Sequence, residues 1–279
     1  MRMTPVCTDG TTTLRQAWQF ALADAPAGSH IATLPELAHA RIETFRRHAP
    51  GKPWKHIRDG STPIWQSSLA TSTALLLGRI RGTLHLVAVH GFAMPPDPLG
   101  GLEEWRRRIR AEDGFQFHLS EKAWRAAAAS APASQRLAYG NKDYPTFNPL
   151  HEKALDEAAC RHHPLFAALF GDALEDYVAA HRQIAHEYVL EDMPSDGLMD
   201  QEYRAFADRP PLLRIDISWP GSLSANWDIP TSGAIGKYAC LESIYAENFR
   251  VGDSDVWSVL TSILTCGPHD KVGAALVTP

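Results

Sequence analysis

Hydrophobic residues at helical spacing predict two long helices, each introduced by a capping-box pattern. The first pattern is Thr33-Leu34-Pro35-Glu36, in which a hydroxyl and a carboxylate three residues apart can each bond the other residue's backbone N–H. The apolar stripe that follows it consists of Leu34, Leu37, Ala38, Ile42 and Phe45. The second pattern spans residues 172–175, and the stripe after it places His181 on an apolar side, where we expect a core histidine.

Strand patterns occupy the first half and the end of the chain. Residues 83–92 are nearly apolar between two glycines, which is typical of a buried strand. Residues 71–78 fit a strand or a helix, and if they form a strand, residues 79–82 turn a hairpin. Residues 212–218 alternate strictly between apolar and polar, which predicts a half-buried strand, and 272–277 fit a last strand. Residues 132–149 resemble a loop. Further helices are predicted over 14–23, 102–110, 120–129, 150–160, from 164, over 232–248 and over 255–265.

Strands interrupted by several helices predict an α+β or a mixed α/β protein. We expect a small sheet with a largely helical middle section, helix-rich overall. A length of 279 residues fits one domain over 1–279, in which residues 100–210 would be a helical insertion.

Composition narrows the class without naming a function. Hydrophobic residues make up 44% and charged residues 21%, as in ordinary globular proteins. The four cysteines show no Cys-x-x-Cys spacing, which argues against a disulfide scaffold and fits a reducing compartment. We find no secretory signal and no apolar stretch near the roughly 18 residues that a membrane span needs, so we expect a soluble cytoplasmic protein.

The net charge of −5 conceals a division between the two halves. Residues 1–140 carry 17 Lys and Arg against 11 Asp and Glu, a balance of +6, and residues 141–279 carry a balance of −11. Such a division would permit head-to-tail docking or binding to a basic partner. The arginines at 106–110 follow Glu103 and Glu104 at helical spacing and would pair with them, which argues against nucleic acid as the partner.

The segment from 219 to 238 is the first candidate site. A predicted strand, a loop containing glycine and a helix start follow one another there, and backbone N–H groups in such a context can hold an anion. Gly233, Gly236 and Lys237 would bind it. A full phosphate-binding loop is excluded because Thr231 replaces its first glycine and Tyr238 replaces its hydroxyl residue. An ordinary turn between a strand and a helix is the alternative.

Candidate acid–base residues come from two other segments. His90 ends the predicted strand, but no Gly-x-Ser-x-Gly elbow follows it, so the pattern of an α/β-hydrolase is incomplete. The loop at 54–65 places His56 and Asp59 between two tryptophans, and an ordinary turn is the alternative there as well. We identify no metal site, since His181 and His186 are spaced too far around a helix to share one ion, and no motif identifies a cofactor.

Three functional interpretations follow, in order of preference. The favoured one is an enzyme for a small anionic substrate, phosphorylated or nucleotide-like, such as a hydrolase or transferase. In it, Gly233, Gly236 and Lys237 hold the anion, and His56, Asp59 or His90 serves as acid or base. The alternative is a non-enzymatic assembly protein that self-associates in a salt-sensitive way through its basic and acidic halves. A nucleic-acid-associated protein ranks third.

Overall fold

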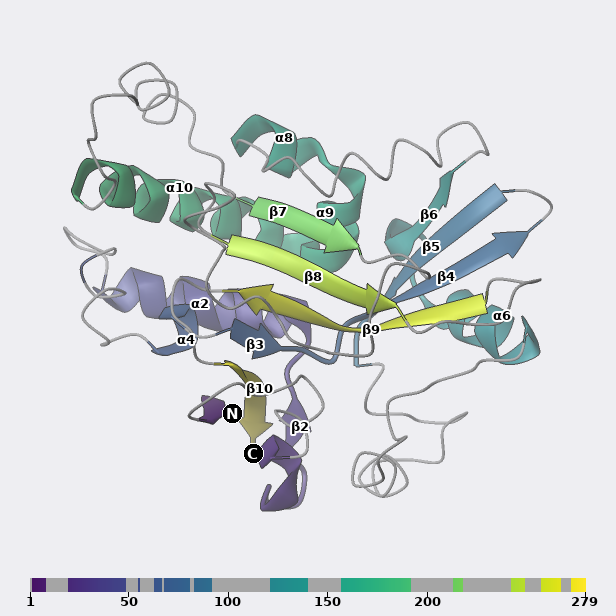
Figure 1. Cartoon of the computed structure of the whole chain (residues 1–279), viewed down its shortest axis with the longest axis horizontal. Helices are drawn as coiled ribbons and strands as arrows, with labels where there is room; N and C mark the ends of the chain where they lie inside the picture. Colours follow the sequence, from purple (N-terminus) through teal and green to yellow (C-terminus); the bar gives the residue numbers. More distant parts are fainter. Residues whose placement is uncertain are drawn as a thin grey trace.

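A computed structural model describes the chain over a set of separate ranges. These are residues 2–8, 20–48, 55, 63–66, 68–80, 83–91, 121–139, 157–191, 213–217, 242–248, 257–266 and 272–279. Within them, runs of strands are separated by helices, and Figure 1 shows α2 and α10 on the left of the view and α6 on the right.

The described strands form one ten-stranded sheet. Their bounds are β1 Arg2–Thr8, β2 His30–Ile31, β3 Ser68–Ala70, β4 Ala74–Ile80, β5 Thr83–Val89, β6 Arg136–Tyr139, β7 Leu213–Ile217, β8 Glu242–Asn248, β9 Trp257–Cys266 and β10 Val272–Thr278. The main path runs β1-β10-β3-β9-β4-β5-β6, with β2 beside β10 and the pair β7-β8 beside β9. The β10–β3 and β7–β8 pairs are parallel and the other described pairs are antiparallel, so the sheet is mixed.

The hairpin β4–β5 confirms the buried strand predicted from the apolar run and resolves the ambiguous segment before it as a strand. Ala74 pairs with Val89 at the open end of the hairpin, and Ile80 pairs with Thr83 at the turn. Leu86, Val87 and Ala88 of β5 are buried. Because this strand lies between β4 and β6 and is covered by side chains, its sequence has little need to alternate.

The helices pack mainly against one another and against buried positions of the sheet. The bounds are α2 Leu34–His48, α4 Pro63–Gln66, α6 Glu121–Ser130, α8 Glu157–His162, α9 Pro164–Phe170 and α10 Leu174–Glu191, with short 3-10 turns η1 at Ala133–Gln135 and η3 at Gly171–Ala173. The predicted starts of α2, α9 and α10 are thereby confirmed. Leu37, Phe166 and Tyr177 are fully buried in one core that also includes Leu69 of β3 and Ala275 of β10. This core holds the helices against the sheet.

Several element predictions are wrong, and all of them err toward helix or loop. Residues 242–248 of the helix predicted over 232–248 form the strand β8, and residues 232–241 lie outside the described ranges. The helix predicted over 255–265 corresponds to the strand β9. The loop predicted over 132–149 contains β6, which pairs with β5. In each case pairing with a neighbouring strand overrides the local preference of the segment.

Strands and helices together place the described part in the mixed α/β class. That confirms the coarser half of the predicted fold class, while a helix-rich chain overall stays a prediction. Whether residues 100–210 form an insertion also stays a prediction, although β6 from this stretch belongs to the common sheet.

Candidate functional site

One of the six predicted site residues lies in the described part of the chain. His90 follows β5 directly, in a turn with Gly91, whose φ of 71° is in the left-handed region that glycine adopts easily. His56, Asp59, Gly233, Gly236 and Lys237 all lie outside the described residues. The site can therefore be built outward from His90.

The register of the β4–β5 hairpin sets the partner of His90. Ala74 pairs with Val89, so the residues one step beyond them, Thr73 and His90, lie opposite each other at the open end. Thr73 Oγ1 is 3.0 Å from His90 Nδ1, within hydrogen-bond distance. The strand pairing thus fixes a hydroxyl against one nitrogen of the imidazole ring.

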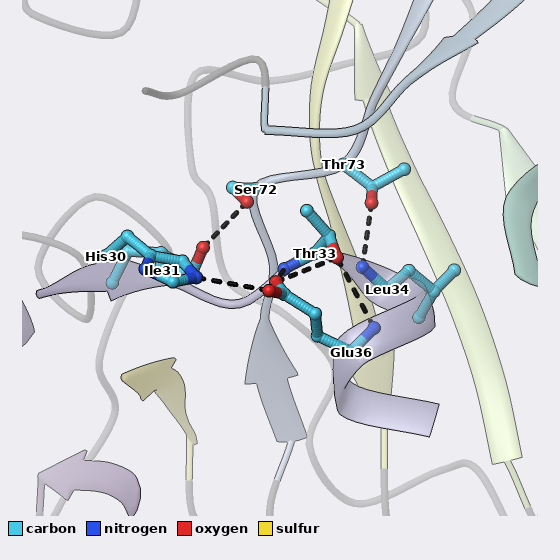
Figure 2. Close-up of polar contacts among 7 residues, drawn as sticks. All are labelled: His30, Ile31, Thr33, Leu34, Glu36, Ser72 and Thr73. Carbon is cyan, nitrogen blue, oxygen red and sulfur yellow. Dashed lines mark hydrogen bonds and ion pairs between the residues drawn. The ribbon is translucent and has the colours of Figure 1, made fainter. Parts of the chain in front are cut away.

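Thr73 belongs to a short buried run of hydroxyl residues between β3 and β4. Thr71, Ser72 and Thr73 have exposed fractions of 0%, 2% and 0%. The Ser72 N–H donates to Ala32 O at 2.7 Å, and its hydroxyl donates to Ile31 O at 2.7 Å. Figure 2 shows this run beside the segment that connects β2 to α2. Buried hydroxyls without partners would be costly, and here the hydroxyls join two chain segments instead.

Thr73 also completes the start of α2. Its Oγ1 accepts the N–H of Leu34, the first residue of the helix, at 2.8 Å (Figure 2). The N–H of Glu36 donates to Thr33 Oγ1 at 3.3 Å, and proline at position 35 has no N–H. The donors that the first turn of a helix leaves unpaired are therefore used within the protein, and this helix start offers no N–H group to an anion.

The predicted capping box of α2 is confirmed. Glu36 Oε2 accepts the Thr33 backbone N–H at 2.8 Å and the Thr33 hydroxyl at 2.9 Å, and Oε1 lies 3.3 Å from His30 Nε2. Partial burial raises the pKa of the Glu36 carboxyl, but the bonds from Thr33 and the contact with His30 outweigh it and hold this pKa below its ordinary value. Glu36 is therefore a carboxylate at neutral pH, and its charge acts on His90.

Burial dominates the electrostatics of His90. It lowers the pKa of the imidazole below 6.5, although the backbone carbonyl of Ala168 in α9 and the negative charge of Glu36 both act to raise it. Nε2 is buried and makes no hydrogen bond to any described residue. Residues from three elements thus surround a ring that is uncharged at neutral pH.

A second buried polar centre, around Arg41, ties α2 to α4 and α10. Arg41 is 1% exposed, its Nε donates to Ile64 O at 2.8 Å, and its Nη1 donates to Tyr177 Oη at 2.7 Å. Its guanidinium also lies over the ring of Trp65, 5.4 Å from the centroid. His181 is buried against Tyr177, with ring centroids 4.4 Å apart, as predicted for a core histidine. We interpret this cluster as structural because it lies within the helical core.

Charge from the basic half meets charge from the acidic half within one molecule. Arg46 of α2 pairs with Asp176 of α10 at 2.7 Å, and His39 of α2 lies 3.3 Å from Asp172. These four side chains are all more than half exposed, so each contact contributes little stability. Some side chains of the basic half thus contact acidic side chains of the other half inside one molecule, and these side chains are less available to a partner.

Thr73 and Glu36 are the neighbours of His90 that sequence reasoning missed. The sequence indicates only a capping role for Glu36, and it predicts the hydroxyl run at 71–73 as part of a strand or helix. A buried run of Thr, Ser and Thr next to a hairpin is a weak signal for polar contacts, and only the register shows which residue it contacts.

Neither the described residues nor known proteins add a second candidate site. Across the described ranges, no group of three or more His, Cys, Asp or Glu residues is arranged to hold a metal ion, and no helix is long and apolar enough to cross a membrane. No protein-family model, curated protein or solved structure matches the chain. The surroundings of His90 are therefore the candidate site.

Proposed function

We propose that the chain is a cytoplasmic enzyme that acts on a small anionic substrate, phosphorylated or nucleotide-like. His90 is the residue on which the proposal rests, because it is a histidine with a pKa lowered by burial, held by a hydroxyl at a strand end. Titratable groups with perturbed pKa values are concentrated at functional sites, although structural networks perturb them as well.

An uncharged imidazole at neutral pH supports two chemical roles. With the proton on Nδ1, the lone pair of Nε2 can accept a proton as a general base. With the proton on Nε2, the ring donates a hydrogen bond to a negatively charged oxygen without changing its own charge. Both roles suit a substrate that carries anionic oxygen, and His56 and Asp59 remain the other candidates for proton transfer.

Gly233, Gly236 and Lys237 are the proposed anion-binding residues. A lysine ammonium supplies charge to a phosphate, and N–H groups at a helix start supply directed hydrogen bonds. The first turn of α2 uses its own N–H groups internally, so it does not compete with these residues for the anion.

Ligand-induced thermal stabilisation tests this proposal. Inorganic phosphate, pyrophosphate and adenosine monophosphate serve as probes for the full chain and for the variants Lys237→Ala and His56→Ala. We expect at least one probe to raise the melting temperature of the wild type and both variants to abolish that rise. Lys122→Ala is the matched control, because it removes the same charge from α6 instead of the predicted loops. If neither Lys237→Ala nor His56→Ala alters the response, the site assignment is wrong.

Mass measurement across a range of salt concentrations separates this proposal from the assembly alternative. An enzyme of the proposed kind responds to an anionic ligand whatever its oligomeric state. A salt-sensitive oligomer that responds to none of the anions would instead favour docking between the basic and acidic halves.

A further inference from the structure

His30 and Glu36 form a histidine–carboxylate pair beside the start of α2. Nε2 of His30 lies 3.3 Å from Oε1 of Glu36, and Figure 2 shows the carboxylate between His30 and Thr33. Backbone pairing fixes the histidine side of the pair, because His30 belongs to β2 and lies opposite Val277 of β10. The sheet and the helix start therefore hold the two side chains in one relative position.

The other carboxylate oxygen of Glu36 is held by two donors from Thr33. Oε2 accepts the backbone N–H at 2.8 Å and the hydroxyl at 2.9 Å. Burial alone would raise the pKa of Glu36, but these two bonds and the contact with His30 hold it below its ordinary value. Glu36 is therefore ionised at neutral pH, and an ionised carboxylate only accepts hydrogen bonds.

Counting protons assigns the ring proton of His30. A neutral imidazole carries one proton, on either Nδ1 or Nε2. Nε2 faces an oxygen of Glu36 that has no proton to donate, so a proton on Nε2 completes a hydrogen bond, whereas a lone pair there would meet another lone pair. Nδ1 is then the nitrogen without a proton, and its lone pair is available to accept one.

The ring of His30 is also in contact with solvent. Its side chain is 11% exposed, and the side chain of Glu36 is 39% exposed. In the described part, the buried ring nitrogens that make no hydrogen bond include Nε2 of His90 and Nδ1 of His163, but neither nitrogen of His30. Of the two histidines on which the charge of Glu36 acts, His30 is thus the one whose free lone pair is not on a buried, unpartnered nitrogen.

We propose that His30 is the general base of the site and that Glu36 is its positioning residue, which keeps the ring proton on Nε2. The proposal rests on the proposed function, because it supplies the proton acceptor for the same anionic substrate. Nδ1 of His30 takes a proton from a water or a substrate hydroxyl, and the oxygen keeps the electron pair and becomes the nucleophile. The ring then carries a positive charge, which the negative charge of Glu36 stabilises.

Nitrogen-15 spectra of the full chain, labelled at histidine, test the position of the ring proton at pH 7.5. The signals of His30 are assigned by their loss in His30→Gln. In the wild type we expect the proton on Nε2 in about tenfold excess or more, because the other form sets two lone pairs against each other. Glu36→Gln should invert this preference. The Thr33 N–H still requires the amide oxygen, so the amide NH₂ group takes the place of Oε1 and donates to Nε2.

Modification with diethyl pyrocarbonate tests whether the ring can react. This reagent attaches to an unprotonated ring nitrogen of a neutral histidine, and mass spectrometry of peptides gives the rate at each histidine. We expect His30 to react in the wild type and Glu36→Gln to slow its reaction about tenfold, because Nδ1 then holds the proton and Nε2 is hydrogen-bonded. His39 is the matched control in the same chain, since its side chain is 55% exposed and contacts Asp172. Its rate should not change.

Each result bears on the proposal. A proton on Nδ1 in the wild type overturns it, and so does an unreactive His30 or an unchanged proton position in folded Glu36→Gln. If Glu36→Gln does not fold, the spectrum and the reactivity of the wild type decide.

Ligand probes separate this proposal from the proposed function. If phosphate, pyrophosphate or adenosine monophosphate stabilises the protein, the same probe should slow the modification of His30. An unchanged rate would place His30 outside the site and overturn the proposal. If no probe stabilises the protein while the proton stays on Nε2, the proposed function fails and the general-base role falls with it, whereas the pairing of His30 with Glu36 stands.

Discussion

Replacing Thr33 with alanine removes one hydroxyl from the start of α2 and leaves the rest of the capping box in place. That hydroxyl accepts the Glu36 N–H at 3.3 Å and donates to Glu36 Oε2 at 2.9 Å. The Thr33 N–H keeps its bond to the same carboxylate at 2.8 Å, and His30 keeps its contact at 3.3 Å. The substitution therefore removes two contacts of a network that otherwise persists.

The size of the effect follows from what remains. Loss of a threonine at this position costs about 1 kcal/mol, within a range of about 0.5–2 kcal/mol. The bond from the Glu36 N–H is long, which favours the lower half of that range. The lost bond to the carboxylate adds to the cost, but the Glu36 side chain is 39% exposed and solvent screens that part. We expect the free energy of unfolding to fall by about 1 kcal/mol and the melting temperature by about 2–4 °C.

Urea unfolding of Thr33→Ala, Thr33→Ser and the wild type at pH 7 provides the assay. Serine keeps the hydroxyl and should retain most of the stability. In Thr33→Ala the pKa of Glu36, followed by carboxyl NMR, should rise, because a bond that favours the charged form is gone. Equal free energies of unfolding for the alanine variant and the wild type would refute the view that this hydroxyl stabilises the helix start.

Three further outcomes follow from other described residues. Burial lowers the pKa of both His90 and His163 below 6.5, so the unfolded chain binds more protons than the folded protein at mildly acidic pH. The stability present above about pH 6.5 should therefore fall as the pH drops. Urea unfolding from pH 8 to 5.5 measures this fall, and His163→Asn should weaken it. In Gly273→Ala the new Cβ would collide with the backbone oxygen of Val6, which should separate β1 from β10 and cost about 1–3 kcal/mol in denaturant unfolding. Amide exchange that shows the β1–β10 pairing intact would contradict this expectation. Phe166→Ala empties a fully buried site and should cost about 3–5 kcal/mol, with Phe166→Leu losing less; a cost below 1 kcal/mol would place Phe166 outside the packed core.

The elements that sequence reasoning found correctly carry local signals. The capping box before α2 places its own bonding groups three residues apart, so its geometry is contained in one turn. The β4–β5 hairpin is also local, with two residues between its strands, although the sequence left the segment of β4 open between strand and helix. Such elements depend little on distant parts of the chain, so most of the signal for them lies in the local sequence.

The segments predicted wrongly carry two patterns at once. In β9 the apolar residues Trp257, Leu260 and Leu264 are spaced as on a helix face, while Val259 and Ile263 add β-branched residues that favour a strand. The outcome depends on β4, β3 and β8, which all pair with β9. Two of these partners, β3 and β4, lie far away in the sequence, so a window around β9 does not contain the contacts that decide its structure.

The neighbours of His90 likewise come from other parts of the chain. The sequence correctly placed this histidine at the end of a strand, where side chains from other elements converge. It did not reveal Thr73 or Glu36 as neighbours. The register of the hairpin places Thr73 beside His90, and Glu36 belongs to the start of a helix, 54 residues before His90 in the chain. Contacts of this kind follow from the assembled sheet.

The position of β10 has a consequence for the order of events during biosynthesis. This strand pairs with β1, β2 and β3, so residues near both ends of the chain are neighbours in the sheet, and Figure 1 shows the two termini close together. Until residues 272–278 have been synthesised, three early strands lack this common partner, and the closure of so long a loop is slow. At roughly 5–20 residues per second, the nascent chain spends tens of seconds with these edges exposed, a period in which a chaperone would protect it from aggregation.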